Sequence, residues 1–369
     1  MSSALSPTST SKRKLSTRRR GISHLPPYQS QESHDQALTA IRTFLKSRTN
    51  YDAFPCLLLN GVVSAPLWNS DTSTFAGMLT VLDIIHLIQY YYHTANWATA
   101  AADVETFRLE SLRDIEKELG VATPPLHREH PSSSLYDAAK LLIQTHARRL
   151  PLLDNDTDTG HEVIVSVLTQ YRLLKFISIN CIKEIQQLNL SLRKLKIGTY
   201  VSRDSAGSDN PYHPIATAKL STTVFDVVHM FSERSISAVP VIDDDGVVLN
   251  MYETVDVITL VRLGAYQSLD LTISEALAKR SPDFPGVIIC TASDSLGTLL
   301  ELIKKRRVHR LVVVEGDEEE KRGGKKGRLL GIITLSDVLR YVIGAVAIGD
   351  AIEQEEEPPQ KTDTPAPAP

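Results

Sequence analysis

The chain repeats one pattern of apolar and polar positions. In three places a Ser or Thr opens an apolar run at helical spacing, and a short apolar strand follows. Ser and Thr at this point are typical of a helix N-cap. The cap residues are Ser134, Thr223 and Ser295, and the third residue of the following strand lies 17 positions later each time, at Pro151, Pro240 and Val312. An equal offset in three places indicates an internal repeat.

A second half of the pattern recurs four times. It consists of a polar turn, as in 243–246, then a second apolar strand and an apolar helix with a polar residue in its first turn. These strand ends and helix starts lie at 78–83, 166–172, 250–256 and 332–337. The repeat unit is therefore predicted to be helix, strand, strand, helix, which gives an α/β (α+β) fold. One unit has only a small core, so we expect the units to pair.

The first unit is shorter than the other three. Counting back 17 positions from Pro66 reaches Thr49, but Pro55 would then lie inside a helix, at a cost of about 3 kcal/mol. We therefore expect a strand and most of a helix to be absent between Pro55 and Cys56. A skipped coding segment, a faulty gene model and a natural variant would each produce this. A polar insertion at 203–214 precedes the third unit.

Composition excludes several classes of protein. The 369 residues carry a formal net charge of −4 and are 42% hydrophobic, which is enough for a large core. No apolar run approaches the roughly 20 residues that span a bilayer, so we expect no membrane partner. Residues 1–11 lack an apolar signal core, so we expect a cytoplasmic and nuclear protein rather than a secreted one. The cysteines lie far apart, at Cys56, Cys181 and Cys290, which argues against disulfides and a zinc site.

Charge is distributed unevenly. Residues 1–35 form a basic tail rich in Ser and Thr, and 348–369 form an acidic, Pro-rich tail; both are predicted to be disordered. The basic triplets at 12–14 and 18–20 suit a nuclear-localisation signal, a contact with an acidic surface or a solvated tail. The repeats lack a basic face, so nucleic acid is not expected as a partner. A charged segment, 315–328, is predicted to be an exposed hairpin loop, and 107–119 either offers a partner surface or packs internally.

Several short stretches carry a resemblance to a known family. They are FLKS at 44–47 with YD at 51–52, APLW at 65–68, GMLT at 77–80, IGTY at 197–200, and VHRLVVV at 308–314 with LSD at 335–337. The units resemble cystathionine-β-synthase (CBS) motifs, and their order resembles the regulatory gamma subunits of the AMP-activated, or sucrose-nonfermenting, protein kinase. The resemblance implies two Bateman modules in a pseudo-symmetric disc. Its four CBS motifs are unit 1 (36–105, truncated), unit 2 (106–190), unit 3 (191–268) and unit 4 (269–347).

The resemblance also implies sites for adenine nucleotides. A carboxylate at a helix start accepts hydrogen bonds from ribose hydroxyls, whereas helix amides, hydroxyls and basic side chains bind phosphate. The family's ribose-binding aspartates correspond to Asp83, Asp256 and Asp337, and unit 2 has Arg172 there, which implies an empty site. Each aspartate alone also suits an ordinary helix start. Their recurrence favours the ribose role.

The phosphate contacts follow from the same resemblance. The implied phosphate-binding residues are Arg310, His309, Arg149, Arg148, Ser336 and Thr334, and the other nucleotide contacts are Thr199 and Ser237. Arg148 stands where the family usually has His, which keeps the positive charge but removes pH sensitivity. Val63 and Ser235 stand where the family often has Arg, which weakens anion binding in units 1 and 3.

The predicted function is that of a non-catalytic energy sensor. AMP, ADP and ATP compete for the sites and control a Ser/Thr protein kinase held by alpha (catalytic) and beta (scaffold) subunits, with no cofactor. An enzyme regulated by CBS motifs is disfavoured because the repeats occupy most of the chain and no P-loop, kinase signature or Ser-His-Asp order remains. The third hypothesis is a nucleotide-binding scaffold for another partner, such as a transcription complex.

Overall fold

The computed structural model describes residues 31–46, 64–69, 72–94, 117–118, 120, 126–202, 210–262, 270–280, 284 and 286–345. Several predictions fall mostly or wholly outside these ranges: the two terminal tails, the break between Pro55 and Cys56, the role of Val63, the proposed partner segment at 107–119 and the polar insertion at 203–214. They stay predictions, with one exception. Residues 31–35 of the basic tail are helical rather than disordered, because they begin α1 (Gln31–Lys46), where the buried His34 forms a hydrogen bond with the Tyr341 hydroxyl.

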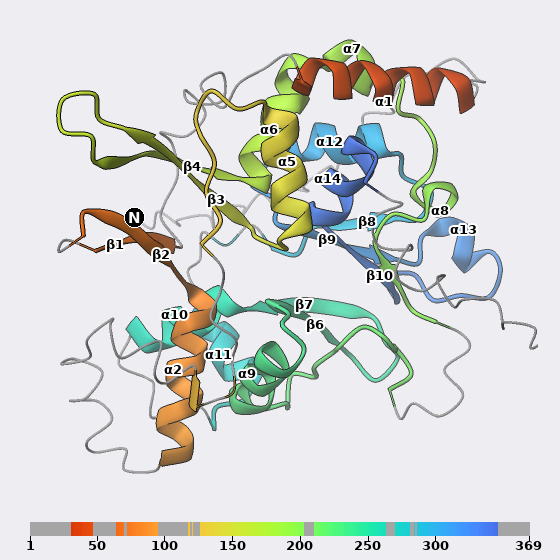
Figure 1. The fold of residues 1–369 in the computed structure, drawn as a ribbon. Helices are drawn as coiled ribbons and strands as arrows, with labels where there is room; N and C mark the ends of the chain where they lie inside the picture. The colour runs from red at the N-terminus through yellow and green to blue at the C-terminus, as the bar shows by residue number, and fades with distance from the viewer. Residues whose placement is uncertain are drawn as a thin grey trace, which may run out of the picture.

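The order helix, strand, strand, helix is present in units 2, 3 and 4 (Figure 1). Unit 2 contains α5 (Leu135–Gln144), β3 (Arg149–Asn155), β4 (Glu162–Thr169) and α6 (Gln170–Asn180). Unit 3 contains α9 (Val224–Glu233), β6 (Ala238–Ile242), β7 (Val248–Glu253) and α10 (Thr254–Arg262). Unit 4 contains α12 (Leu296–Lys305), β9 (Arg310–Val314), β10 (Leu329–Thr334) and α14 (Leu335–Ile343).

Unit 1 has its second half in the described residues. It consists of β1 (Ser64–Asn69), β2 (Thr74–Thr80) and α2 (Val81–Thr94). The preceding α1 (Gln31–Lys46) packs against α5 and α14, which belong to units 2 and 4. The remaining elements connect the units: α7 (Ile182–Ile185), α8 (Leu192–Leu195), β5 (Thr199–Tyr200), α11 (Ile273–Ala278), β8 (Ile289–Thr291) and α13 (Asp317–Glu320).

The three predicted N-caps are confirmed. The side chains of Ser134, Thr223 and Ser295 each accept a hydrogen bond from the backbone N–H three residues later, at the start of α5, α9 and α12. This bond satisfies one of the amide groups that the first turn of a helix leaves unpaired. The equal spacing in the sequence therefore reflects three helices that start in the same way.

In each unit the two strands form an antiparallel hairpin. The hairpin of unit 4 is widened into a sheet of order β5-β10-β9-β8, in which β8 runs parallel to β9. Segment 315–328 connects β9 to β10 and contains α13, which confirms the predicted hairpin loop.

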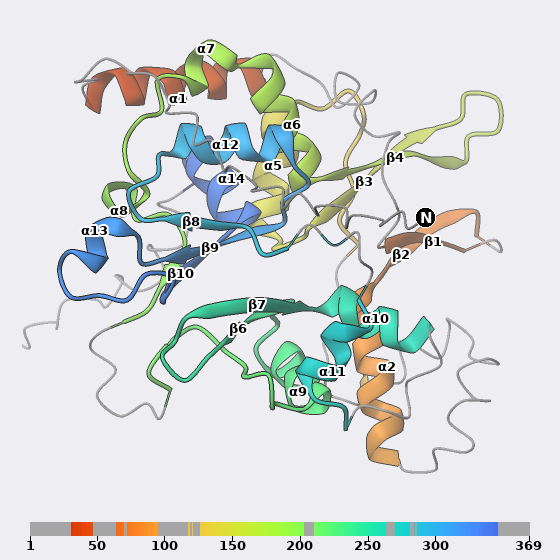
Figure 2. The same cartoon turned by 180° about the vertical axis from the view of Figure 1, so that it is seen from behind.

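Apart from α1, each unit packs mainly against two others. Helices α12 and α14 of unit 4 pack on α6 and α5 of unit 2, in the upper half of Figure 1, and α2 of unit 1 packs on α9 and α10 of unit 3, in the lower half. Strands make the other contacts: β2 meets β4, and Ile242 and Met251 of unit 3 share a core with Val312, Val314 and Leu329 of unit 4. Figure 2 shows the same two helical groups from behind. This is the arrangement expected of two paired modules.

Three further findings concern the described residues alone. None of their helices is both long and apolar enough to cross a bilayer. No group of three or more His, Cys, Asp or Glu side chains there is arranged to hold a metal ion. Cys181 and Cys290 are buried and carry no disulfide bond.

Candidate functional site

Arg310, the first residue of β9, links units 3 and 4. Its Nη2 donates a hydrogen bond to Ser237 Oγ at 3.1 Å, and its Nη1 lies 3.4 Å from Glu253 Oε1. Burial lowers the pKa of this guanidinium, and the charge of Glu253 opposes that effect. Nη1 is buried and makes no hydrogen bond within the described residues. A buried donor without an acceptor is costly, so this atom is suited to an incoming anion.

Four other basic side chains form a cluster with Arg310, and in three of them burial and the charges of neighbouring members lower the pKa. Burial, then the charges of Arg310 and Arg149, lower the pKa of Arg148 to about 10. Burial, then the charges of Arg307, Arg310, Arg149 and Arg148, lower the pKa of His309 to about 4. The structure therefore brings together the four basic residues predicted from the sequence. Burial together with these charges keeps the imidazole neutral at pH 7, and the combined positive charge favours a bound anion.

Arg307 belongs to this cluster but was not predicted. Its charge acts on both Arg149 and His309. The only sequence signal for it is its place in the basic run KKRRVHR at 304–310. A basic run is more often a solvated helix end, so nothing in the sequence singled out this residue.

The start of α14 carries three predicted residues. Asp337 Oδ2 accepts hydrogen bonds from Thr334 N at 2.8 Å and Thr334 Oγ1 at 2.7 Å, and Thr334 Oγ1 accepts one from Asp337 N at 3.3 Å. These bonds form a reciprocal capping box. Asp337 Oδ1 has no hydrogen-bond partner among the described residues, so one carboxylate oxygen is available to a ribose hydroxyl.

Ser336 is tied to unit 2 through Gln170. Ser336 Oγ donates to Gln170 Oε1 at 2.9 Å, and the buried Gln170 donates from Nε2 to Ala147 O at 3.1 Å. Both predicted hydroxyl groups of unit 4, Thr334 and Ser336, therefore already donate to an internal acceptor. A phosphate would have to replace those acceptors before either hydroxyl could donate to it. The positive charge that attracts a phosphate comes from the arginines instead.

The other predicted aspartates occupy equivalent positions. Asp83 accepts a hydrogen bond from Thr80 N at the start of α2, and Asp256 accepts one from Glu253 N at 2.8 Å at the start of α10. Each carboxylate therefore bonds the backbone N–H three residues before it, as Asp337 does. The two differ from Asp337 in their surroundings: Asp83 is buried, and Asp256 is also bound by Arg280.

Unit 2 has no carboxylate at the corresponding position. Arg172 lies in the first turn of α6, and its Nη1 donates to Val167 O at 3.1 Å. Its charge adds to that of Arg307 on Arg149. A guanidinium cannot accept ribose hydroxyls, which agrees with the empty site expected for unit 2.

Thr199 lies on β5, where it pairs with Ile332 of β10, two residues before Thr334. The preceding Gly198 has φ +97°, and a Cβ there would lie 2.6 Å from Ile332 O. Glycine at 198 therefore permits the close approach of β5 to β10 that places Thr199 beside unit 4.

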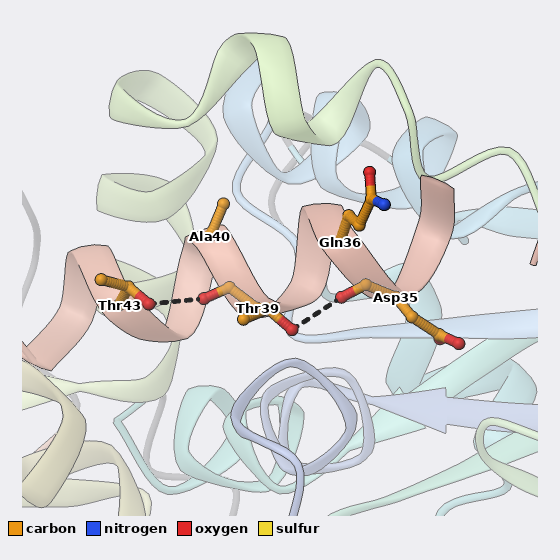
Figure 3. Close-up of a pocket in the computed structure, with 5 residues that line it drawn as sticks. All are labelled: Asp35, Gln36, Thr39, Ala40 and Thr43. Carbon is orange, nitrogen blue, oxygen red and sulfur yellow. Dashed lines mark hydrogen bonds between the residues drawn. The ribbon is translucent and has the colours of Figure 1, made fainter. Parts of the chain in front are cut away.

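An open hollow of about 790 Å³ lies elsewhere, along one face of α1 (Figure 3). It is lined by Asp35, Gln36, Thr39, Ala40 and Thr43. The two threonine hydroxyls donate to backbone carbonyls of the same helix, at 2.8 and 2.9 Å. None of the predicted nucleotide contacts lines this hollow, and we assign it no role.

The comparisons with known proteins agree with this geometry. The CBS domain family matches residues 115–179, 211–262 and 283–344, within units 2, 3 and 4. The 5′-AMP-activated protein kinase subunit gamma of Kluyveromyces lactis is 40% identical over 329 residues, which are 84% of this chain and 93% of that protein. The same subunit of Saccharomyces cerevisiae is 39% identical over 326 residues, covering 83% and 94%.

A solved structure shares the fold. The crystal structure of a Methanocaldococcus jannaschii protein, described as a candidate archaeal homologue of gamma-AMPK, covers 80% of this chain and 94% of its own at a TM-score of 0.50 and 15% identity. With 40% identity over most of both sequences, the relatives define the family. The chain belongs to the family of gamma subunits of the 5′-AMP-activated protein kinase.

Proposed function

We propose that this chain is the non-catalytic regulatory subunit of a heterotrimeric Ser/Thr protein kinase and that AMP, ADP and ATP compete for its CBS units. The family membership supports the first part of the proposal. The observation that carries the second part is the basic cluster around Arg310. Arg310 of β9 pairs with Thr334 of β10, and Asp337, which has an open carboxylate oxygen, follows three residues later.

The site of unit 4 offers complementary groups for a nucleotide. Asp337 Oδ1 accepts from the ribose, and Nη1 of Arg310, which lacks a hydrogen bond within the described residues, donates to the phosphate. Arg148, Arg149 and His309 supply further positive charge or donors for additional phosphates. AMP, ADP and ATP share the ribose and the first phosphate, so their binding at one unit is mutually exclusive.

Competition of this kind regulates a kinase only if the nucleotides prefer different conformations. A ligand shifts an equilibrium between two states by no more than its difference in affinity for them. Arg310 contacts Ser237 and Glu253 of unit 3, so a phosphate that attracts Arg310 also changes the contact between units 3 and 4. This contact is a direct route from the bound nucleotide to the relative placement of the two units.

The same proposal includes assembly of this chain with kinase alpha and beta subunits. It also includes a location in the cytoplasm and nucleus. Affinity purification of the full-length chain followed by mass spectrometry tests the partners. Recovery of a kinase catalytic subunit together with a scaffold subunit is expected. Recovery of a different complex without a kinase would favour the scaffold hypothesis instead.

Isothermal titration of AMP and ATP into the full-length chain tests the binding. We expect saturable binding that Arg310→Gln weakens strongly. Arg322→Gln is the matched control, because Arg322 is exposed in the loop between β9 and β10. Absence of binding by the parent chain would refute the nucleotide sites, and equal loss in the control would refute the role of Arg310.

A further inference from the structure

Arg280 binds both oxygens of the Asp256 carboxylate. Its Nε donates to Oδ1 at 2.7 Å and its Nη2 donates to Oδ2 at 2.5 Å, in the bidentate geometry that makes such pairs strong. Both side chains are largely buried, with 10% of Arg280 and 12% of Asp256 exposed. Water therefore competes little for this pair.

Other groups hold Arg280 in the same place. Its Nη1 donates to Asn250 Oδ1 at 3.0 Å, and its Nη2 also donates to Met251 O at 2.7 Å. The guanidinium carbon lies 3.8 Å from the centre of the Phe284 ring, a stacking that favours a cation. These contacts come from β7 and from the segment after α11, so the arginine joins two parts of the chain.

Units 3 and 4 therefore differ at equivalent carboxylates. Asp337 uses one oxygen for the start of α14 and leaves the other without a partner among the described residues. Asp256 accepts three hydrogen bonds, one from Glu253 N and two from Arg280, out of the roughly four that a carboxylate accepts. The two hydroxyls of a ribose need two acceptor positions, and the hydrogen bonds already made to the Asp256 carboxylate leave about one.

We propose that Arg280 occupies the ribose position of unit 3 and must leave Asp256 before an adenine nucleotide binds there. This inference rests on the proposed function, because it concerns one of the same nucleotide sites. The apparent affinity of a site equals its intrinsic affinity multiplied by the fraction of molecules in which the site is open. Unit 3 therefore binds adenine nucleotides more weakly than unit 4, and the interactions of Arg280 set the difference.

The test isolates unit 3 in the full-length chain. In a background carrying Asp83→Ala and Asp337→Ala, unit 3 is the CBS unit that keeps its predicted ribose carboxylate. AMP is titrated at pH 8 into this background with and without Arg280→Gln. We expect Arg280→Gln to tighten AMP binding at least tenfold, and Arg322→Gln, in an exposed loop, to leave it unchanged. Unchanged or weaker binding with Arg280→Gln would overturn the proposal.

A second variant covers the case in which Arg280→Gln fails to fold. Asn250→Ala removes one anchor of Arg280 and leaves the ion pair with Asp256 in place. It is expected to tighten AMP binding in the same background about threefold, and no gain would overturn the proposal. The parent chain distinguishes failure of the proposed function from failure of this inference. If the parent chain binds no AMP at all, the proposed function fails. If it binds AMP and these variants show no gain, only the role of Arg280 is rejected.

Discussion

Arg310 of unit 4 donates a hydrogen bond to Ser237 of unit 3 at 3.1 Å, across the contact between the two units. The same guanidinium keeps one buried nitrogen without a hydrogen bond within the described residues. One side chain thus joins two units and still has a donor for a ligand. This relationship is the basis of the first prediction.

Arg310→Gln is predicted to weaken AMP binding by roughly 10- to 150-fold, because a hydrogen bond to a charged group contributes about 1.5–3 kcal/mol. Isothermal titration measures the change. Ser237→Ala is the matched variant, since it removes the internal acceptor but keeps the charge, and we expect less than about a fivefold effect. Similar affinities for Arg310→Gln and the parent chain would contradict the assignment.

Asp337→Asn separates ribose binding from helix capping. An amide oxygen still accepts from Thr334, so the start of α14 should keep most of its stability, but the charged acceptor for the ribose is lost. Asp337→Ala removes both, with a further loss of stability of about 1 kcal/mol. Thermal unfolding and AMP titration on both variants check this. If Asp337→Asn binds AMP as the parent does, the carboxylate does not contact the ribose.

The lowered pKa of His309 predicts proton uptake on nucleotide binding. The imidazole is neutral at pH 7 in the free chain, and a phosphate beside it would favour the charged form and raise its pKa. AMP affinity should therefore rise as the pH falls towards the raised pKa of the bound imidazole. Titration at each pH in two buffers of different ionisation enthalpy measures the uptake. His309→Gln should abolish it; persistent uptake would assign the proton to another group.

The same pKa predicts an effect on the stability of the free chain. Because the folded value, about 4, lies below the ordinary 6.5, the unfolded chain binds more protons between these two values. The contribution of His309 to stability is therefore present above pH 6.5 and is lost as the pH falls towards 4. His309→Gln should show a smaller loss of unfolding temperature over that range, and an identical loss would contradict the shift.

Gly198→Ala is predicted to destabilise the chain by several kcal/mol. The new Cβ would lie 2.6 Å from both Ile332 O and Ile333 Cγ1, in addition to the strain of φ +97°. Gly160→Ala is the control, because Gly160 has φ +69° but no atom near its added Cβ, so it should lose only about 1 kcal/mol. Chemical denaturation measures both, and equal losses would show that the contact with β10 does not matter.

Much of the fold follows from local chemistry in the sequence. Ser134, Thr223 and Ser295 are N-caps because a hydroxyl satisfies the first helical amides, and this requirement repeats with each unit. Asp256 and Asp337 could be placed in the first turns of helices because the helix dipole favours a carboxylate there. Local patterns of this kind need only a few consecutive residues.

Contacts between distant residues could not be predicted in this way. Arg280 lies 24 positions from Asp256, and no spacing rule connects a residue after α11 with the start of α10. Gln170 reaches Ser336 across 166 positions because units 2 and 4 pack through their helices. These pairs depend on how the units meet, which the repeat alone leaves undetermined.

Competition between AMP and ATP shows most directly whether adenine nucleotides share the CBS sites of this chain. AMP is titrated into the full-length chain without ATP and at several fixed ATP concentrations. We predict that the apparent Kd of AMP rises linearly with the ATP concentration and that Arg310→Gln weakens the binding of both nucleotides. Saturable AMP binding that ATP leaves unchanged, or no binding of either nucleotide, would contradict shared nucleotide sites in the CBS units.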